Sequence, residues 1–192
     1  IAFARVPPRT RFNSESRVCV RVCILMTDYV LGIDVGIRNM GLCAFDLHTG
    51  RVAHWARVPL LPANHPIRAG RLPTYVQQFL ASHAELFEHA SKIVIEHQLR
   101  GLMKSIEQML HLKFFERVLV VQPRALKAHY GCATGDYEQN KRAAERWARD
   151  RMAAEPELFE PAALESFESE AKQDDMADAL MLVCFFRDTY VL

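Results

Sequence analysis

The sequence predicts an α/β protein in which a central mixed β-sheet is flanked by helices. Three short apolar segments come first and are joined by tight connections, which is typical of antiparallel strands. Further apolar segments then alternate with helical patterns, as in parallel strands whose connecting helices cover the sheet. With 192 residues, the chain is long enough for one domain with a substantial core.

The first three strands are expected to form an antiparallel meander. The apolar patterns place these strands at 28–35, 40–46 and 51–58. A turn at 48–50, which ends in a glycine, connects the second strand to the third. The segment 59–67 contains three prolines and is expected to be a loop.

The rest of the chain alternates between helical and strand patterns. The expected strands are short and apolar, and they lie at 91–96 and 117–121. The expected helices show apolar residues at helical spacing, and they lie at 74–90, 101–115, 138–153 and 172–187. The intervening segment 154–171 is acidic and contains two prolines, which favours a surface loop.

The start of the chain differs in composition from the remainder. Residues 1–25 contain five arginines but only one acidic residue, Glu15, and Met26 directly follows them. We expect residues 1–25 to be a disordered leader or extension, and residues 26–192 to be the folded domain. A mitochondrial transit peptide has a similar composition and is the alternative interpretation of this segment.

Cysteine content and hydropathy exclude two classes of protein. The cysteines are scattered and odd in number, which argues against a disulfide scaffold. The pair Cys19 and Cys23 lacks a second pair of ligands at zinc-finger spacing. Because no apolar run reaches the roughly 18–20 residues that span a bilayer, we expect no membrane segment.

Carboxylates stand at the ends of buried elements, where they are costly. Asp34 ends the first expected strand, and Glu96 ends the fourth. Asp175 and Asp178 are three residues apart, so they share one face of the last helix. Each acid alone could be a solvated strand end or a first-turn helix acid. Together they predict a divalent metal site, because bound cations offset the cost of burying carboxylates.

Three motifs resemble those of the RuvC-type Holliday junction resolvases, which belong to the RNase H-like superfamily. They are Leu31–Gly41, Ile93–Gln98 and Gln173–Leu180, and the poxvirus and fungal mitochondrial resolvases are the most similar. The resemblance spans about residues 28–188 and implies an RNase H-like fold. It also implies a Mg²⁺-dependent endonuclease of DNA recombination or repair, with two ions per active site and Mn²⁺ as a substitute.

The resemblance also assigns roles to individual residues. It implies that the catalytic, metal-binding acids are Asp34, Glu96, Asp175 and Asp178. Asp174 could replace Asp175 geometrically, although the family spaces its last two acids by three residues. A catalytic lysine is implied between the second and third acids. Lys127 fits best, and Lys141 is the second candidate.

The implied substrate is a four-way DNA junction that is cut by paired symmetric incisions. Because such a junction has near two-fold symmetry, a homodimer is implied. The candidate DNA contacts are Lys104, Lys141, Arg142 and Arg146. Arg142, Arg146 and Arg149 form a basic stripe at helical spacing, but Glu145 and Asp150 interrupt it, so a solvated face is the alternative.

Three other functions remain open from the sequence. Another RuvC-like nuclease, such as a transposase-type enzyme, would cut unbranched DNA as well. A non-catalytic junction-binding module would bind without cutting, and an actin-like or sugar-kinase-like phosphotransferase would depend on ATP. We expect an intracellular protein, located in the viral factory or host cytoplasm if it is poxvirus-like. If residues 1–25 are a transit peptide, the mitochondrial matrix is expected.

Overall fold

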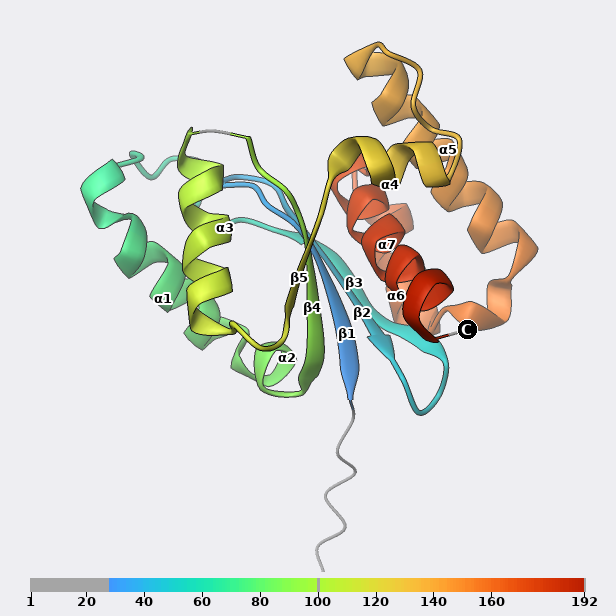
Figure 1. Cartoon of the computed structure of the whole chain (residues 1–192), viewed down its shortest axis with the longest axis horizontal. Coiled ribbons are helices and arrows are strands. Elements are labelled where there is room, and N and C mark those ends of the chain that lie inside the picture. Colours follow the sequence, from blue (N-terminus) through green and yellow to red (C-terminus); the bar gives the residue numbers. More distant parts are fainter. Residues whose placement is uncertain (1–27, 100, 192) are drawn as a thin grey trace, which may run out of the picture.

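The computed structural model describes residues 28–99 and 101–191, and it is built around one five-stranded mixed sheet. The spatial order of the strands is β3-β2-β1-β4-β5 (Figure 1). Their bounds are Tyr29–Asp34 (β1), Met40–Asp46 (β2), Arg51–Val58 (β3), Ala90–Glu96 (β4) and Val118–Val121 (β5). β1, β2 and β3 are antiparallel neighbours, whereas β4 runs parallel to β1 and β5 runs parallel to β4. The predicted mixed sheet is therefore confirmed.

Helices cover both faces of this sheet, as the alternation of apolar segments predicts (Figure 1). One face carries η1 (Ala69–Arg71), α1 (Leu72–Ser82), α2 (Ala84–Glu88) and α3 (Gly101–Lys113). The other face carries α4 (Pro123–His129), α5 (Tyr137–Ala154), η2 (Pro156–Leu158), α6 (Pro161–Ser169) and α7 (Asp174–Phe186), which continues into η3 (Arg187–Val191). Each face has its own apolar core, because successive strand residues point to opposite sides of a sheet.

The helix α7 lies directly on the sheet, because two glycines let its backbone approach. A Cβ atom at Gly32 of β1 would lie 2.4 Å from the carbonyl oxygen of Ala179. A Cβ atom at Gly41 of β2 would lie 2.0 Å from the carbonyl oxygen of Asp175. Gly41 pairs with Asp34 across the sheet. The first turn of α7 is thereby brought to the end of β1.

The prediction of one continuous helix at 74–90 is wrong, because the helix is interrupted at His83. This residue has φ −121° and ψ 28°, outside the helical region, and it separates α1 from α2. Its Nδ1 atom lies 2.9 Å from the carbonyl oxygen of Phe79, and its backbone N–H also bonds to that oxygen. The chain changes direction at His83, and α2 then leads directly into β4.

The prediction of a surface loop at 154–171 is also wrong, because this segment contains η2 and α6. Phe167 of α6 stacks on Trp55 of β3 at a ring distance of 4.1 Å, and Phe159 stacks on the same indole at 5.7 Å. The indole N–H of Trp55 donates to the carbonyl oxygen of Met176, 2.7 Å away. These aromatic contacts bury a segment whose acidic composition favours a loop. The short helix α4 was likewise not predicted.

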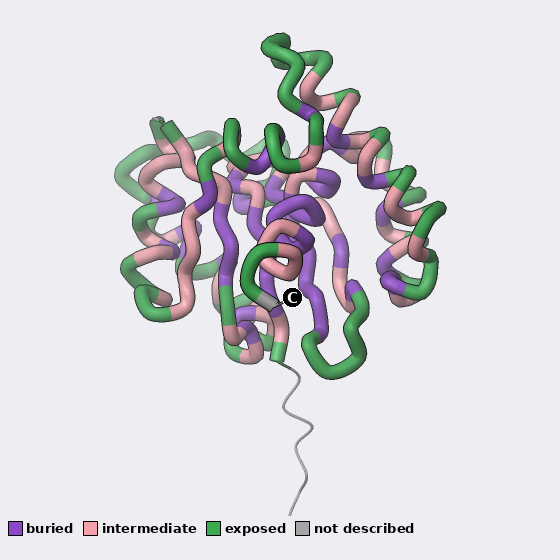
Figure 2. The backbone as a smooth tube through the Cα atoms, turned by 45° about the vertical axis from the view of Figure 1, so that its right-hand side comes forward, coloured by how far each residue is buried: buried purple, intermediate pink, exposed green. Residues whose placement is uncertain are grey.

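Burial follows this layered arrangement. The central strands β1, β2 and β4 and the helix α7 are largely buried, whereas the outer helices expose one side (Figure 2). Cys43, Cys132 and Cys184 are free and buried, while Cys19 and Cys23 lie outside the described residues. The predicted leader at 1–25 lies outside them too. Within the described residues, no helix is long and apolar enough to span a membrane.

Candidate active site

The two strand-end acids lie side by side at one edge of the sheet. Asp34 ends β1 and Glu96 ends β4. These strands are parallel neighbours, and Ile33 pairs with Ile95 immediately before the two acids. Both acids line a cavity of about 760 Å³ at this edge. The carboxyl ends of parallel strands, where α/β proteins bind ligands, therefore present two carboxylates here.

The first turns of α7 add three more acids to the same cavity. Asp174, Asp175 and Asp178 all line its wall. They reach it because Gly41 allows the carbonyl of Asp175 to approach β2 beside Asp34. The structure thus brings together every acid that the sequence singled out.

Two lysines line the cavity as well. Lys127 of α4 is buried, and its Nζ atom donates to Oδ1 of Asp178. Lys141 of α5 lies 3.0 Å from Oδ2 of Asp174, and its ammonium sits 4.7 Å from the ring centre of Tyr137. Both lysine candidates therefore contact the α7 acids, and Lys127 is the one paired with Asp178.

Within residues 28–99 and 101–191, no hydrogen bond or ion pair reaches the carboxylates of the strand-end acids, and Lys127 acts on them only at a distance. Burial, followed by repulsion from Asp178, Glu96 and Asp175, raises the pKa of Asp34 well above its usual range. Burial and repulsion from Asp178 raise the pKa of Glu96 to about 7. Burial also raises the pKa of Asp178, although Lys127 opposes this shift. The cavity consequently holds more negative charge than its lysines neutralise, and a bound cation would relieve this excess.

The two neighbouring acids at the start of α7 differ from each other. Burial opposes ionisation of Asp174, but hydrogen bonds from Lys172 and Lys141 leave its pKa below the usual range. Burial raises the pKa of Asp175, and one bond from Lys172 does not offset it. Asp175, but not Asp174, is among the charges that raise the pKa of Asp34. Asp175 is thus the one of the two that interacts electrostatically with Asp34.

The donor set fits Mg²⁺, which prefers carboxylate oxygens and retains several waters. Asp34, Glu96, Asp175 and Asp178 would supply such oxygens from one cavity wall. Within the described residues, no three His, Cys, Asp or Glu side chains are already grouped as metal ligands. Lys127 holds one oxygen of Asp178 instead. Metal binding would therefore require small side-chain movements.

The predicted DNA-contacting residues are not all at the cavity. Lys141 lines it, whereas Arg142 and Arg146 are exposed on α5 outside it. Lys104 lies 2.7 Å from Oε1 of the buried Glu107 and does not line the cavity. The sequence interpretation missed Arg124, which does line it. Its signal was its place in the first turn after β5, at the same edge of the sheet.

No family model matches this chain, and no curated protein matches it either. Solved structures of Holliday junction resolvases do resemble it. The yeast mitochondrial Holliday junction resolvase is 18% identical, with a TM-score of 0.62, over 84% of each chain. The fowlpox virus resolvase in complex with Holliday junction DNA is 12% identical, with a TM-score of 0.62, over 85% of this chain and 99% of that one.

A second structure of the fowlpox virus Holliday junction resolvase is 14% identical, with a TM-score of 0.56, over 84% of this chain and 99% of that one. At these identities the likeness establishes the fold. The chain has the RNase H-like fold seen in these resolvases, as the motifs predict.

Proposed function

We propose that this chain is a divalent-metal-dependent endonuclease that resolves four-way DNA junctions. One observation carries the proposal: carboxylates from β1, β4 and α7 converge on a single cavity at one edge of an RNase H-like sheet. A structural acid cluster would be expected to have internal counter-ions. Here Asp34 and Glu96 are half-buried with raised pKa values instead, which supports a cation-binding role.

In this proposal Asp34, Glu96, Asp175 and Asp178 hold two Mg²⁺ ions, and Mn²⁺ substitutes for them. When bound, the metal would activate the attacking water and stabilise the leaving oxygen of the phosphodiester. The chain orients these acids through the end of β1, the end of β4 and the first turns of α7. Lys127, which is held beside Asp178, supplies a positive charge to the scissile phosphate.

The proposed substrate accounts for the basic residues around the cavity. Arg124 and Lys141 in its wall, and the exposed Arg142 and Arg146 beside it on α5, would contact phosphates. Paired symmetric incision of a four-way junction requires two active sites, and a homodimer provides them. The fowlpox virus neighbour was solved with such a junction, which supports this choice of substrate.

The test is cleavage of a labelled synthetic four-way junction in Mg²⁺, compared with a linear duplex of the same sequence. We expect paired, symmetric nicks on the junction that disappear in the Asp34→Asn variant. Equal cutting of the linear duplex would favour another RuvC-like nuclease. Binding of the junction without cleavage by the unaltered chain would favour a non-catalytic junction-binding module.

A further inference from the structure

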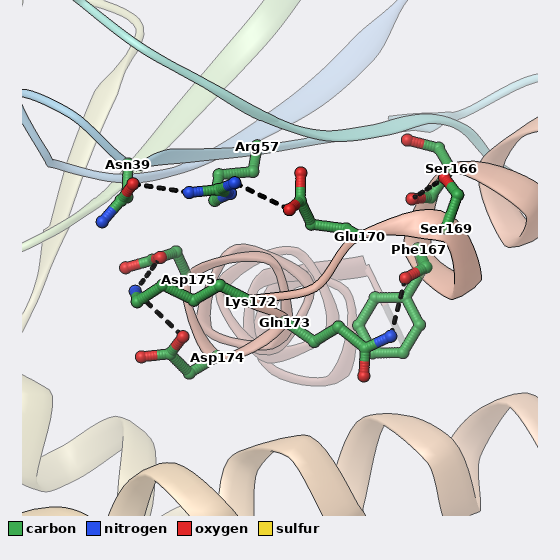
Figure 3. Close-up of polar contacts among 10 residues, drawn as sticks. All are labelled: Asn39, Arg57, Ser166, Phe167, Ser169, Glu170, Lys172, Gln173, Asp174 and Asp175. Carbon is green, nitrogen blue, oxygen red and sulfur yellow. Dashed lines mark hydrogen bonds and ion pairs between the residues drawn. The ribbon is translucent and has the colours of Figure 1, made fainter. Parts of the chain in front are cut away.

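The two adjacent acids that begin α7 have different oxygen atoms available. In Asp174, Oδ1 lies 2.9 Å from Nζ of Lys172, and Oδ2 lies 3.0 Å from Nζ of Lys141. In Asp175, Oδ2 accepts a hydrogen bond from the same Nζ of Lys172 (Figure 3). No hydrogen bond or ion pair within residues 28–99 and 101–191 reaches Oδ1 of Asp175. Both oxygens of Asp174 therefore have a lysine partner, whereas Oδ1 of Asp175 is left for another ligand.

Lys172 binds one oxygen of each acid from outside the cavity, whereas Lys141 contacts only Asp174. Lys127 and Lys141 line the cavity wall, but Lys172 does not. Its side chain bridges the two carboxylates from the segment that precedes α7 (Figure 3). A lysine in this position acts on the acids and not on a substrate that fills the cavity.

The segment that carries Lys172 is fixed on both sides of it. Before Lys172, Glu170 forms a 2.7 Å ion pair with Arg57 of β3. Arg57 also donates a hydrogen bond to Oδ1 of Asn39 at 2.6 Å. After it, Nε2 of Gln173 donates to the carbonyl oxygen of Phe167 at 2.8 Å (Figure 3). These contacts tie the segment to β3 and α6. The ammonium of Lys172 is therefore placed by the fold.

We propose that Lys172 is a positioning residue that orients Asp175 as the metal ligand at the start of α7, while Lys141 occupies the second oxygen of Asp174. This inference rests on the proposed metal-dependent function. Lys172 forms an ion pair with one oxygen of each acid, and Lys141 forms an ion pair with the other oxygen of Asp174. Partners that hydrogen-bond to ligating carboxylates orient them, and losing such a partner weakens metal binding.

The test is Mn²⁺ binding by isothermal titration calorimetry in the absence of DNA. We expect Lys172→Met to weaken Mn²⁺ binding by about tenfold or more. Removing a positive charge near the acids would by itself tighten cation binding, so weakening identifies orientation as the cause. Lys172→Arg keeps the charge and the donors, and should restore most of the affinity. Lys92→Met removes the same charge from the opposite end of β4 and should leave affinity unchanged.

The two aspartates provide the second half of the test. Asp175→Asn should weaken Mn²⁺ binding severely, whereas Asp174→Asn should change it little. At saturating Mn²⁺, junction cleavage by Lys172→Met should approach that of the unaltered chain, because the defect lies in metal binding. Thermal unfolding verifies that each variant is folded, and the two aspartate variants test the assignment if Lys172→Met does not fold.

Separate outcomes would overturn the inference and the proposed function. Equal or tighter Mn²⁺ binding by Lys172→Met, or equal losses in Asp174→Asn and Asp175→Asn, would overturn the role of Lys172 while metal binding stands. Mn²⁺ binding with the expected pattern, but without junction cleavage, would overturn the proposed function and leave the ligand assignment in place. No Mn²⁺ binding by the unaltered chain would overturn both.

Discussion

The acids at the strand ends and those at the start of α7 differ in the partners that surround their carboxylates. Within the described residues, no hydrogen bond or ion pair reaches the carboxylates of Asp34 and Glu96, and burial raises both pKa values. At the start of α7, Lys172 and Lys141 hold Asp174, and Lys172 also holds Asp175. Lys127 does the same for Asp178, about one turn further along α7.

The difference indicates how such a site can be both stable and ready for a cation. Lysines from α4, α5 and the segment before α7 lie against the helix acids and offset part of the cost of burying them when no metal is bound. Within the described residues no lysine is paired with the strand-end acids, so their negative charge favours an external cation. Variants that add or remove charge at the two places should therefore have different consequences.

The largest expected effect is on catalysis at the strand ends. Asp34→Asn should lower the rate of junction cleavage by at least about 10³-fold, because it removes a metal ligand at the reacting phosphate. The measurement is single-turnover cleavage of a labelled junction. Asp28→Asn, which changes an exposed aspartate just before β1, is the matched control and should cleave normally. Substantial cleavage by Asp34→Asn would remove the strand-end acids from the proposed mechanism.

The close approach of α7 to the sheet predicts the next largest effect. Gly41→Ala would place a methyl group 2.0 Å from the carbonyl oxygen of Asp175, and should destabilise the fold by about 1–3 kcal/mol. It should also reduce cleavage, since the helix acids would be displaced from Asp34. Urea unfolding measures the first effect. Gly70→Ala, where a Cβ meets nothing within 4 Å, is the control. Equal stability of the two variants would contradict the packing described here.

The dependence of stability on pH should report the raised pKa of the strand-end acid Glu96. The pKa of Glu96 is raised to about 7 from 4.5, so the folded state holds this proton more tightly than the unfolded state. Its contribution to stability is thus complete below the unfolded pKa and is lost as pH rises through about 7. The metal-free protein should lose thermal stability across this window, and Mg²⁺ should restore it.

Glu96→Gln isolates that contribution, because it keeps the shape of the side chain without the titrating proton. The difference in melting temperature between this variant and the unaltered chain should grow in the variant's favour from pH 5 to pH 8 without metal. Mg²⁺ should reduce the difference. A difference in melting temperature that is independent of pH would mean that the fold does not raise the pKa of Glu96.

The smallest expected effect concerns the segment before α7. Arg57 and Glu170 are partly exposed, at 27% and 23% of their side-chain surface, so their coupling should be only about 0.2–1 kcal/mol. A double-mutant cycle with Arg57→Met and Glu170→Gln, followed by urea unfolding, measures it. Arg51 and Glu160, a more exposed pair from β3 to α6, provide the comparison and should couple more weakly. A larger value for Arg51 and Glu160 would contradict the role of Arg57 as an anchor.

Local patterns were sufficient to predict the sheet, because its strands are short and apolar and end in acids or turns. All five strands lie within a residue or so of their predicted positions, and the acids were found as interruptions of those patterns. The helix α6 was missed because it is short and its segment is acidic with two prolines, and because the stacking of Phe167 on Trp55 joins residues distant in sequence. The break at His83 was missed because the apolar spacing continues through it.

The sequence by itself determined which acids are the candidates for the proposed chemistry, since a carboxylate at the end of a buried strand is conspicuous without any structure. It left Asp174 and Asp175 as alternatives, because adjacent residues of the same type differ only in what surrounds them. The tertiary structure decided their surroundings: Lys172 and Lys141 come from different segments and meet only at Asp174. Gly41 lets the start of α7 approach Asp34, and such contacts depend on packing between distant parts of the chain.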